Sequence, residues 1–251
     1  MTEVIRVSCV QDGIFRLDLN DPERKNLLTV ELGREFLAAL AEVALDPTLK
    51  ALVITGREDV FCGGASLESL KQLTSGIIDV KDLFAVQSQL LNFPVPIVAA
   101  LQGHAVAGGL MLALCCDILV ASESSRYGLN FTRMGFTPAM GATTLLPAVV
   151  GYHFANEMIL TGKLYKGREL KGRGVFNYVV RSQEVLDTAF NLARDIAEKP
   201  MHVVQLLKET FALPRLQALQ EARHREHLMH KICFSRPEIE SIIEEAYIDQ
   251  A

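Results

Sequence analysis

Phe61-Cys62-Gly63-Gly64-Ala65-Ser66 and Gly103-His104-Ala105-Val106-Ala107-Gly108-Gly109 are two glycine-rich turns, and each lies between an apolar strand-like run and a helix-like run. Glycine allows positive φ angles and close approach of a ligand to the backbone. Turns of this kind leave backbone N–H groups unpaired. Two such donors that converge on one point stabilise a developing oxyanion. The two turns therefore predict chemistry that passes through an enolate or a tetrahedral intermediate.

Acid–base groups are missing where such a site would be expected to carry them. Leu110-Met111-Leu112 follows the second turn without a carboxylate, and Asn130-Phe131-Thr132 further along has none either. The chain thus predicts a pair of oxyanion donors without neighbouring carboxylates.

Composition excludes several classes of protein. With 251 residues, 49% of them hydrophobic, the chain is long enough for one domain, or one domain with a helical appendage. Its net charge of −5 argues against nucleic acid as a partner, because phosphate binding needs an excess of Lys and Arg. His104, Gly108 and Asp117 interrupt the longest apolar stretches, so no membrane span is expected. Residues 1–6 do not resemble a signal peptide, and we expect a cytoplasmic protein.

The cysteines favour a reducing compartment. They are odd in number and form no CxxC pair, which is typical of reduced thiols. Cys62 lies inside the first turn, but no neighbouring base is evident, and we interpret it as a core residue rather than a nucleophile. The five are Cys9, Cys62, Cys115, Cys116 and Cys233.

Strand-like and helix-like runs alternate, which predicts an α/β core with strands buried on both faces. An antiparallel pair is expected over 4–10 and 14–19, and Thr29 is expected to cap a helix. Buried strands are predicted at 51–56, 96–101 and 117–121, and helices at 66–73, 80–91 and 108–115.

The later part of the chain is mostly helical in pattern. Residues 127–141 read as irregular, and a strand is expected at 177–181. Pro200, Pro214 and Pro237 predict the starts of three C-terminal helices. We therefore expect a core over residues 1–195 and a C-terminal helical region over 196–251 that belongs to the same functional domain.

The chain resembles the crotonase (enoyl-CoA hydratase/isomerase) superfamily over almost its whole length. The resemblance rests on the two turns and their spacing, and further on Asp21-Pro22, Asn26, Cys116-Asp117-Ile118 and Thr161-Gly162. It implies repeated ββα units, a C-terminal helical region, and a homotrimer or a dimer of trimers. It also implies that the N–H groups of Ala65 and Gly108 form an oxyanion hole around a thioester carbonyl.

The sequence departs from the hydratases of this superfamily at two positions. Family hydratases carry a glutamate after the second turn and another in the later irregular segment, and the aligned residues here are Met111 and Phe131. Hydration without those groups lacks its general acid and base. Hydratase activity is therefore not expected.

A longer motif resembles one group within the superfamily. Residues 130–143, NFTRMGFTPAMGAT, are similar to the matching segment of decarboxylases from polyketide β-branching cassettes. The resemblance implies loss of CO2 from a 3-methylglutaconyl group on an acyl carrier protein, which gives a 3-methylcrotonyl group. This reaction needs no base, because the carboxylate leaves as CO2, and Met111 and Phe131 would line an apolar substrate pocket.

Three histidines lie close together near the C-terminus. At about 100° per residue, His224 and His230 point about 120° apart on a helix, so with His227 they cannot converge on one metal ion. His230 falls on the apolar stripe, whereas His224 faces away. Residues 226–234, EHLMHKICF, match the segment in which the decarboxylases carry a histidine proton donor. By that resemblance His230 is the expected donor, although a histidine on an apolar face is more often a core residue.

A cation for the substrate carboxylate is harder to place. The decarboxylases carry a lysine after the first turn, but one ungapped alignment puts Leu73 there. Lys81 and Lys71 are the local candidates, and we favour Lys81. A solvated lysine beside Asp79 and Asp82 is an equal alternative for Lys81.

Two other functions stay open. A double-bond isomerase would use the same dienolate with His230 as the group that moves the proton. A non-catalytic homologue would only bind a carrier protein. No metal or organic cofactor is expected, since the acyl group arrives on the phosphopantetheine of an acyl carrier protein or on coenzyme A. Arg24-Lys25 suits either carrier.

Overall fold

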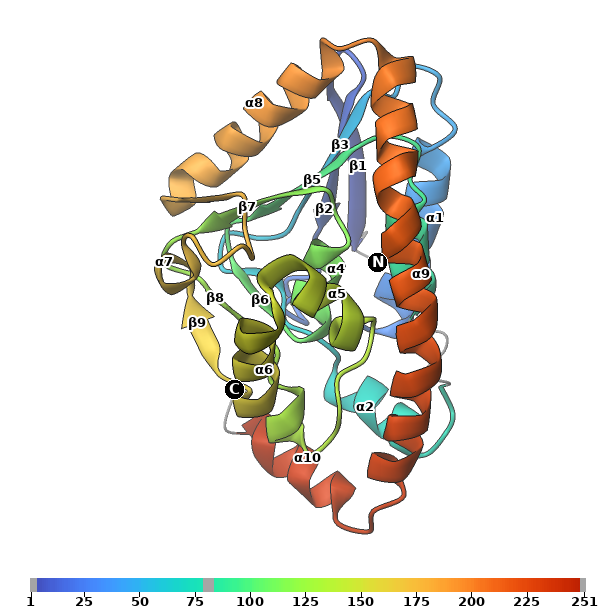
Figure 1. The fold of residues 1–251 in the computed structure, drawn as a ribbon, viewed down its shortest axis with the longest axis vertical. Coiled ribbons are helices and arrows are strands. Elements are labelled where there is room, and N and C mark those ends of the chain that lie inside the picture. The colour runs from blue at the N-terminus through green and yellow to red at the C-terminus, as the bar shows by residue number, and fades with distance from the viewer. Residues whose placement is uncertain (1–3, 79–83, 249–251) are drawn as a thin grey trace.

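The structure is a computed structural model that describes residues 4–78 and 84–248 (Figure 1). Within these residues, a six-stranded sheet has the order β1-β2-β3-β5-β7-β10, and a four-stranded sheet has the order β4-β6-β8-β9. The large sheet contains β1 (Ile5–Gln11), β2 (Ile14–Leu19), β3 (Ala51–Thr55), β5 (Ile97–Leu101), β7 (Ile118–Ser122) and β10 (Tyr178–Val180). The small sheet contains β4 (Val60–Cys62), β6 (His104–Val106), β8 (Arg126–Gly128) and β9 (Leu164–Lys166).

Helices connect and cover the strands. Those in the first half of the described chain are α1 (Val30–Val43), α2 (Leu67–Thr74), α3 (Phe84–Leu91) and α4 (Gly108–Leu114), followed by a 3-10 helix, η2 (Phe131–Met134). Those in the second half are α5 (Ala142–Val150), α6 (Tyr152–Thr161), α7 (Gly167–Leu170), η3 (Ser182–Glu184), α8 (Val185–Ala197), α9 (Met201–Phe234) and α10 (Ile239–Ile248).

Repeated strand–strand–helix units build the core, as the family resemblance implied. In β3-β4-α2 and again in β5-β6-α4, the first strand joins the large sheet and the second joins the small sheet. The β1–β2 hairpin is antiparallel, and the Thr29 hydroxyl accepts the N–H of Leu32 at the start of α1, so both of these predictions are confirmed. Part of the region expected to be irregular forms β8 and η2, and β9 was not predicted.

Both faces of the central strands of the large sheet are buried, whereas the edge strand β1 is mostly exposed. Helix α8 covers one face, where Ala189 and Ala193 pack against Val53, Val98 and Val120. The other face carries the main core. Because neighbouring residues of a strand point to opposite faces, β3 and β5 are apolar at every position except Thr55.

The prediction of three C-terminal helices divided by Pro214 was wrong. Pro200 caps α9 and Pro237 precedes α10, but Pro214 lies inside the continuous 34-residue helix α9, which runs along one side of the molecule (Figure 1). A proline inside a helix removes one hydrogen bond and does not necessarily end it. Despite the length of α9, no helix among the described residues is long and apolar enough to cross a membrane.

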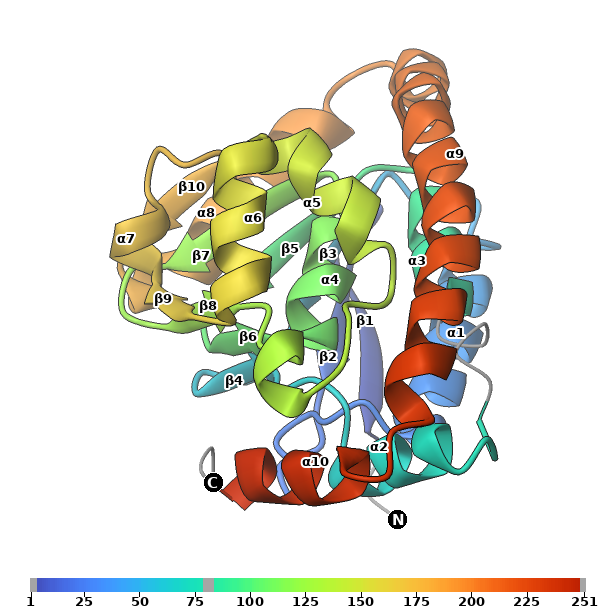
Figure 2. The same ribbon diagram turned by 60° about the horizontal axis from the view of Figure 1, so that its bottom comes forward.

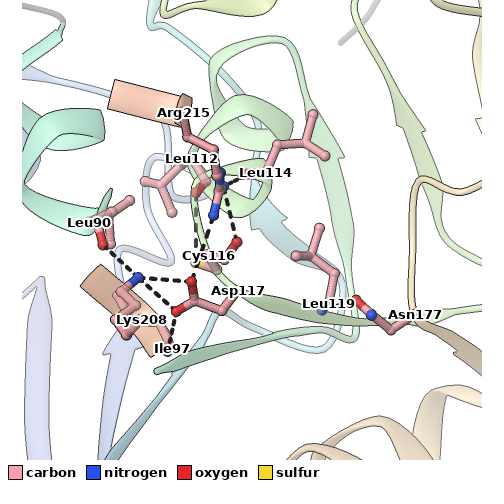
Figure 3. A network of polar contacts seen from close by, with 10 residues as sticks. All are labelled: Leu90, Ile97, Leu112, Leu114, Cys116, Asp117, Leu119, Asn177, Lys208 and Arg215. Carbon is pink, nitrogen blue, oxygen red and sulfur yellow. Dashed lines mark hydrogen bonds and ion pairs between the residues drawn. The ribbon is translucent and has the colours of Figure 1, made fainter. Parts of the chain in front are cut away.

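Side chains on both sides of Pro214 fasten α9 to the core (Figure 3). The buried Lys208 ammonium lies 2.8 Å from both carboxylate oxygens of Asp117, and Asp117 also accepts the N–H of Ile97 at 2.8 Å. Arg215 donates to the carbonyl oxygens of Leu114 at 2.6 Å and Cys116 at 3.2 Å. These contacts fix α9 to the core on both sides of Pro214.

The two partners of this ion pair should differ in their effect on stability. Asp117→Asn leaves the Lys208 charge buried and unpaired, and we expect it to lower the free energy of unfolding by about 3–5 kcal/mol. Lys208→Met leaves Asp117 with the Arg215 guanidinium, 3.6 Å from its carboxylate, and with the Ile97 N–H. It should cost only about 1 kcal/mol. Urea denaturation of both variants measures the difference. An equal or larger loss in Lys208→Met would contradict this account.

Candidate functional site

Parallel pairing of two short strands brings the glycine-rich turns together. Strand β4 pairs with β6, with Val60 opposite His104 and Cys62 opposite Ala105. Since both strands end at the same edge of the small sheet, the turns that follow them lie side by side. Their contact is so close that a Cβ atom on Gly109 would lie 2.1 Å from the carbonyl oxygen of Cys62. Only glycine fits at this position.

The two N–H groups expected to form the oxyanion hole belong to peptides that are fixed by hydrogen bonds to their carbonyl oxygens. Among the described residues, no acceptor is found for the N–H of Ala65 or Gly108. Leu28 N–H donates at 2.7 Å to the Gly64 carbonyl, which belongs to the same peptide as the Ala65 N–H. Met111 N–H donates at 3.0 Å to the Ala107 carbonyl, which likewise belongs to the Gly108 peptide. These bonds orient both N–H groups before any ligand binds, as an oxyanion site requires.

Strain in the second turn adds to this preorganisation. Ala107 has φ 47° and ψ −116°, which a residue with a Cβ rarely adopts. Its N–H donates to the Gly128 carbonyl at 2.9 Å. Such a conformation costs about 1–3 kcal/mol and persists where the surrounding structure enforces it, most often at functional sites.

Met111 and Phe131 are both buried in apolar surroundings. Met111 lies on α4 one turn after Gly108 and has no exposed surface. Phe131 in η2 packs edge-on against Phe136, with ring centroids 6.0 Å apart. Both side chains belong to the main hydrophobic core. The two positions at which the hydratases carry glutamates are therefore apolar in this chain.

His230 faces the core, as the helical pattern predicted. Its ring is 2% exposed, and Nε2 lies 2.6 Å from the Thr137 carbonyl oxygen. The ring also packs against Phe136, at 5.7 Å between centroids, so His230 and Phe131 contact the same phenylalanine. His224 is exposed, and in the described part of the chain no three His, Cys, Asp or Glu residues are placed to hold a metal ion.

Burial decides the protonation state of His230. Burial lowers the pKa of this ring, and the backbone at Thr137 and Pro138 partly opposes that shift. A neutral ring that donates from Nε2 carries no proton on Nδ1. Nδ1 is buried, and within the described residues it has no hydrogen-bond partner.

Met140 was not predicted and lies directly against Gly108. A Cβ atom on Gly108 would be 2.9 Å from Met140 Sδ. Met140 has φ 63°, a left-handed conformation that is costly for a side chain of this size, and Gly141 follows with φ 84°. Residues 137–141 therefore connect the carbonyl bound by His230 to the Gly108 donor.

Glu226 is a second residue that was missed. Its carboxylate accepts the N–H of Gly141 and the N–H of Thr143, each at 2.9 Å, and the Thr143 hydroxyl at 2.7 Å. Burial raises the pKa of Glu226, and these three hydrogen bonds partly oppose the shift. One signal was present in the sequence, because Glu226 precedes His230 by four residues and so shares its face of the helix.

Two lysines, Lys71 and Lys81, were candidates for binding the substrate carboxylate. Lys71 is half exposed, and its ammonium pairs with Glu244 of α10 at 2.5 Å, so it already has a carboxylate partner. Lys81 lies outside the described residues and stays a prediction. Helix α10 also contacts the first turn, because the Tyr247 hydroxyl donates to the Ala65 carbonyl at 2.8 Å; Figure 2 shows α10 beside α2.

In the Arg24-Lys25 pair, which was suggested to bind the carrier, one of the two side chains already forms ion pairs within the chain. Arg24 pairs with Asp21 at 3.4 Å and with Glu31 at 3.3 Å, whereas Lys25 is exposed.

The sequence matches the enoyl-CoA hydratase/isomerase family over residues 10–248. It is 33% identical over 244 residues to the bacillaene synthase decarboxylase PksI of Bacillus subtilis, covering 97% of this chain and 98% of that protein.

Two solved structures are similar over nearly their full length. One, from a dehydratase/decarboxylase enzyme couple involved in polyketide β-branching, has a TM-score of 0.93 at 32% identity and covers 98% of this chain and 99% of that one. The ECH2 decarboxylase domain of CurF from Lyngbya majuscula has a TM-score of 0.89 at 32% identity, with 96% and 98% covered.

The buried ring of His230 should make stability depend on pH. Because its pKa is lower in the folded state than in the unfolded chain, the unfolded chain binds more protons between the two values. The contribution of His230 is full above about pH 6.5 and is lost as the pH falls toward the lower folded-state value.

We therefore expect the free energy of unfolding to fall more steeply in the wild type than in His230→Gln between about pH 7.5 and about pH 5.5. The difference should reach at most about 1.4 kcal/mol per pH unit. Urea denaturation at several pH values measures it. Parallel curves for the two proteins would show that His230 does not carry this dependence.

Proposed function

The chain belongs to the enoyl-CoA hydratase/isomerase family, and we propose that it decarboxylates a 3-methylglutaconyl thioester on an acyl carrier protein to a 3-methylcrotonyl thioester during polyketide β-branching. Its full-length similarity to decarboxylases of polyketide biosynthesis supports this role. The observation that carries the proposal is the paired Ala65 and Gly108 donors beside a site whose two expected glutamates are replaced by Met111 and Phe131.

The proposed reaction needs an oxyanion site more than it needs a base. When the bond to the carboxylate breaks, its electron pair passes through the double bond to the thioester oxygen and forms a dienolate. Donation from Ala65 and Gly108 to that oxygen would contribute about 3–4 kcal/mol each in the transition state. Protonation of the dienolate at its γ carbon gives the 3-methylcrotonyl product.

Met111 and Phe131 suit a substrate that brings its own carboxylate. A glutamate at 4 Å from the substrate carboxylate would repel it by about 1 kcal/mol in water, and by several times more in a partly buried site. The apolar side chains avoid this repulsion. They also withhold the acid and base that hydration of the double bond requires.

His230 is the proposed proton donor. With Nε2 bound to the Thr137 carbonyl, Nδ1 is the nitrogen available for the transfer, and it carries a proton only in the imidazolium form. Burial, the largest influence on the pKa of this ring, disfavours that form, whereas the backbone at Thr137 and Pro138 favours it, and a bound substrate carboxylate would favour it further. The proton then passes from Nδ1 to the dienolate, which leaves a neutral ring.

Lys81 is the proposed partner of the substrate carboxylate, because Lys71 is already paired with Glu244. The reaction as proposed uses no metal or organic cofactor. The acyl group is carried on phosphopantetheine, with coenzyme A as the alternative carrier.

A decarboxylation assay tests the proposal. The protein is incubated with 3-methylglutaconyl acyl carrier protein and, separately, with the coenzyme A thioester, and mass spectrometry follows the loss of CO2. We expect turnover, and faster turnover on the carrier protein. His230→Gln should lower kcat by about 10²–10⁴-fold, and Lys81→Met should mainly raise KM.

His224→Gln is the matched control, because His224 is exposed on the same helix, and it should leave both constants unchanged. Double-bond movement without loss of mass would favour the isomerase alternative. Binding of the carrier protein without any chemistry would favour the non-catalytic one. Either result would replace the decarboxylase proposal.

A homotrimer, or a dimer of trimers, is the proposed assembly. Val203, Leu207 and Phe211 follow one another at four-residue spacing on α9, so they line one exposed face of the helix. A groove of about 700 Å³ lies on a neighbouring face of the same half of α9, where Leu206 and Leu213 line it together with residues 91–94. A row of exposed apolar side chains of this kind is typical of a surface covered by another protein subunit.

Analytical ultracentrifugation tests the assembly. We expect the mass of a trimer or hexamer for the wild type and a smaller species for Leu207→Asp/Phe211→Asp. Leu228→Asp, at another exposed position of α9, should keep the wild-type mass. A monomeric wild type at micromolar concentration would contradict this assembly.

A further inference from the structure

Glu226 and His230 act on the same loop from one face of α9. They are four residues apart and both are buried. His230 Nε2 binds the carbonyl of Thr137, and Glu226 binds the N–H groups of Gly141 and Thr143. The two side chains therefore hold residues 137–143 at both ends.

The carboxylate of Glu226 is satisfied without a cation. It forms no ion pair among the described residues. Its Oε2 accepts the Gly141 N–H, and its Oε1 accepts both the N–H and the hydroxyl of Thr143. A glutamine could accept at one oxygen only, and its NH2 group would then face a backbone N–H. The site requires the ionised carboxylate.

These hydrogen bonds support a conformation that the loop would not otherwise keep. Met140 and Gly141 are both left-handed, with φ 63° and 84°, and the bond from Gly141 to Glu226 fixes the turn directly after Met140. In this conformation Met140 is buried and its thioether lies against Gly108. The backbone around the Gly108 N–H is thus packed from the side of α9.

We propose that Glu226 is a positioning residue of this site: by holding Met140-Gly141 in the left-handed conformation, it packs Met140 against Gly108 and keeps the Gly108 N–H directed at the thioester oxygen. This inference rests on the proposed function, which identifies that oxygen as the oxygen of a thioester. It assigns Glu226 no contact with the substrate.

The polarisation of a bound thioester carbonyl reports on the Gly108 hydrogen bond, and it can be measured without turnover. The probe is the 3-methylcrotonyl thioester of pantetheine with ¹³C at the carbonyl, and its NMR shift is recorded when bound to the full-length protein. Hydrogen bonds to the carbonyl oxygen displace this shift from its value in water. In Glu226→Gln we expect at least half of the displacement to be lost, kcat to fall by about 10–100-fold and KM to change by less than about threefold.

Three further variants separate positioning from general stability. Lys208→Met removes another buried charged group from the same helix, and it should lower the melting temperature without changing the carbonyl shift. Thr143→Val removes one of the three donors and should have an intermediate effect. Met140→Gly removes the contact with Gly108 but accepts φ 63° without strain, so it should fold and still lose the displacement.

The outcomes are distinct. A wild-type carbonyl shift in Glu226→Gln or in Met140→Gly would overturn the inference, and so would an equal loss in Lys208→Met. A wild-type protein that does not displace the shift would overturn it too. If the wild type displaces the shift and Glu226→Gln loses it, but 3-methylglutaconyl thioester is not decarboxylated, the proposed function fails while the positioning role stands.

Discussion

Parallel pairing of β4 with β6 is the constraint on which the site depends. Each strand has only three residues, yet the pair sets the turns of Ala65 and Gly108 next to each other at one edge of the small sheet. The turns touch so closely that Gly109 has no room for a Cβ atom. Hydrogen bonds to the Gly64 and Ala107 carbonyls then fix the two peptide planes. The donors are therefore oriented by the fold itself, which spares the reorganisation that a flexible site would need.

Helix α9 is fixed to the core through its buried polar groups. A polar side chain taken out of water must find partners, and Lys208, Glu226 and His230 all find theirs in the core. Lys208 binds Asp117 beside the large sheet, whereas Glu226 and His230 bind the loop that reaches Gly108. These three contacts leave the helix little freedom to rotate or slide. Because each buried polar group must be hydrogen-bonded, these contacts also fix the position of His230 against the loop.

In the proposed reaction, the apolar residues at positions 111 and 131 determine which thioester enolate forms, and they do not disable the site. An oxyanion hole stabilises any thioester enolate, whichever bond breaks to form it. What differs within such chemistry is where the electron pair comes from and which group delivers the proton. Here Met111 and Phe131 offer no base, and His230, bound to the Thr137 carbonyl, packs against Phe136, which also contacts Phe131.

Local sequence pattern was enough to predict the α/β core, the hairpin, the cap at Thr29, the two turns and the buried face on which His230 lies. The prediction at Pro214 failed, because contacts from Lys208 and Arg215 to the core outweigh the lost hydrogen bond of one proline. The contacts of Glu226 and Met140 could be found in the folded structure alone. Glu226 meets Gly141 across 85 residues of sequence, and no local pattern specifies a partner at that separation. The left-handed backbone of Met140 could not be predicted from its residue type either, because that conformation arises from the tertiary contacts that enforce it.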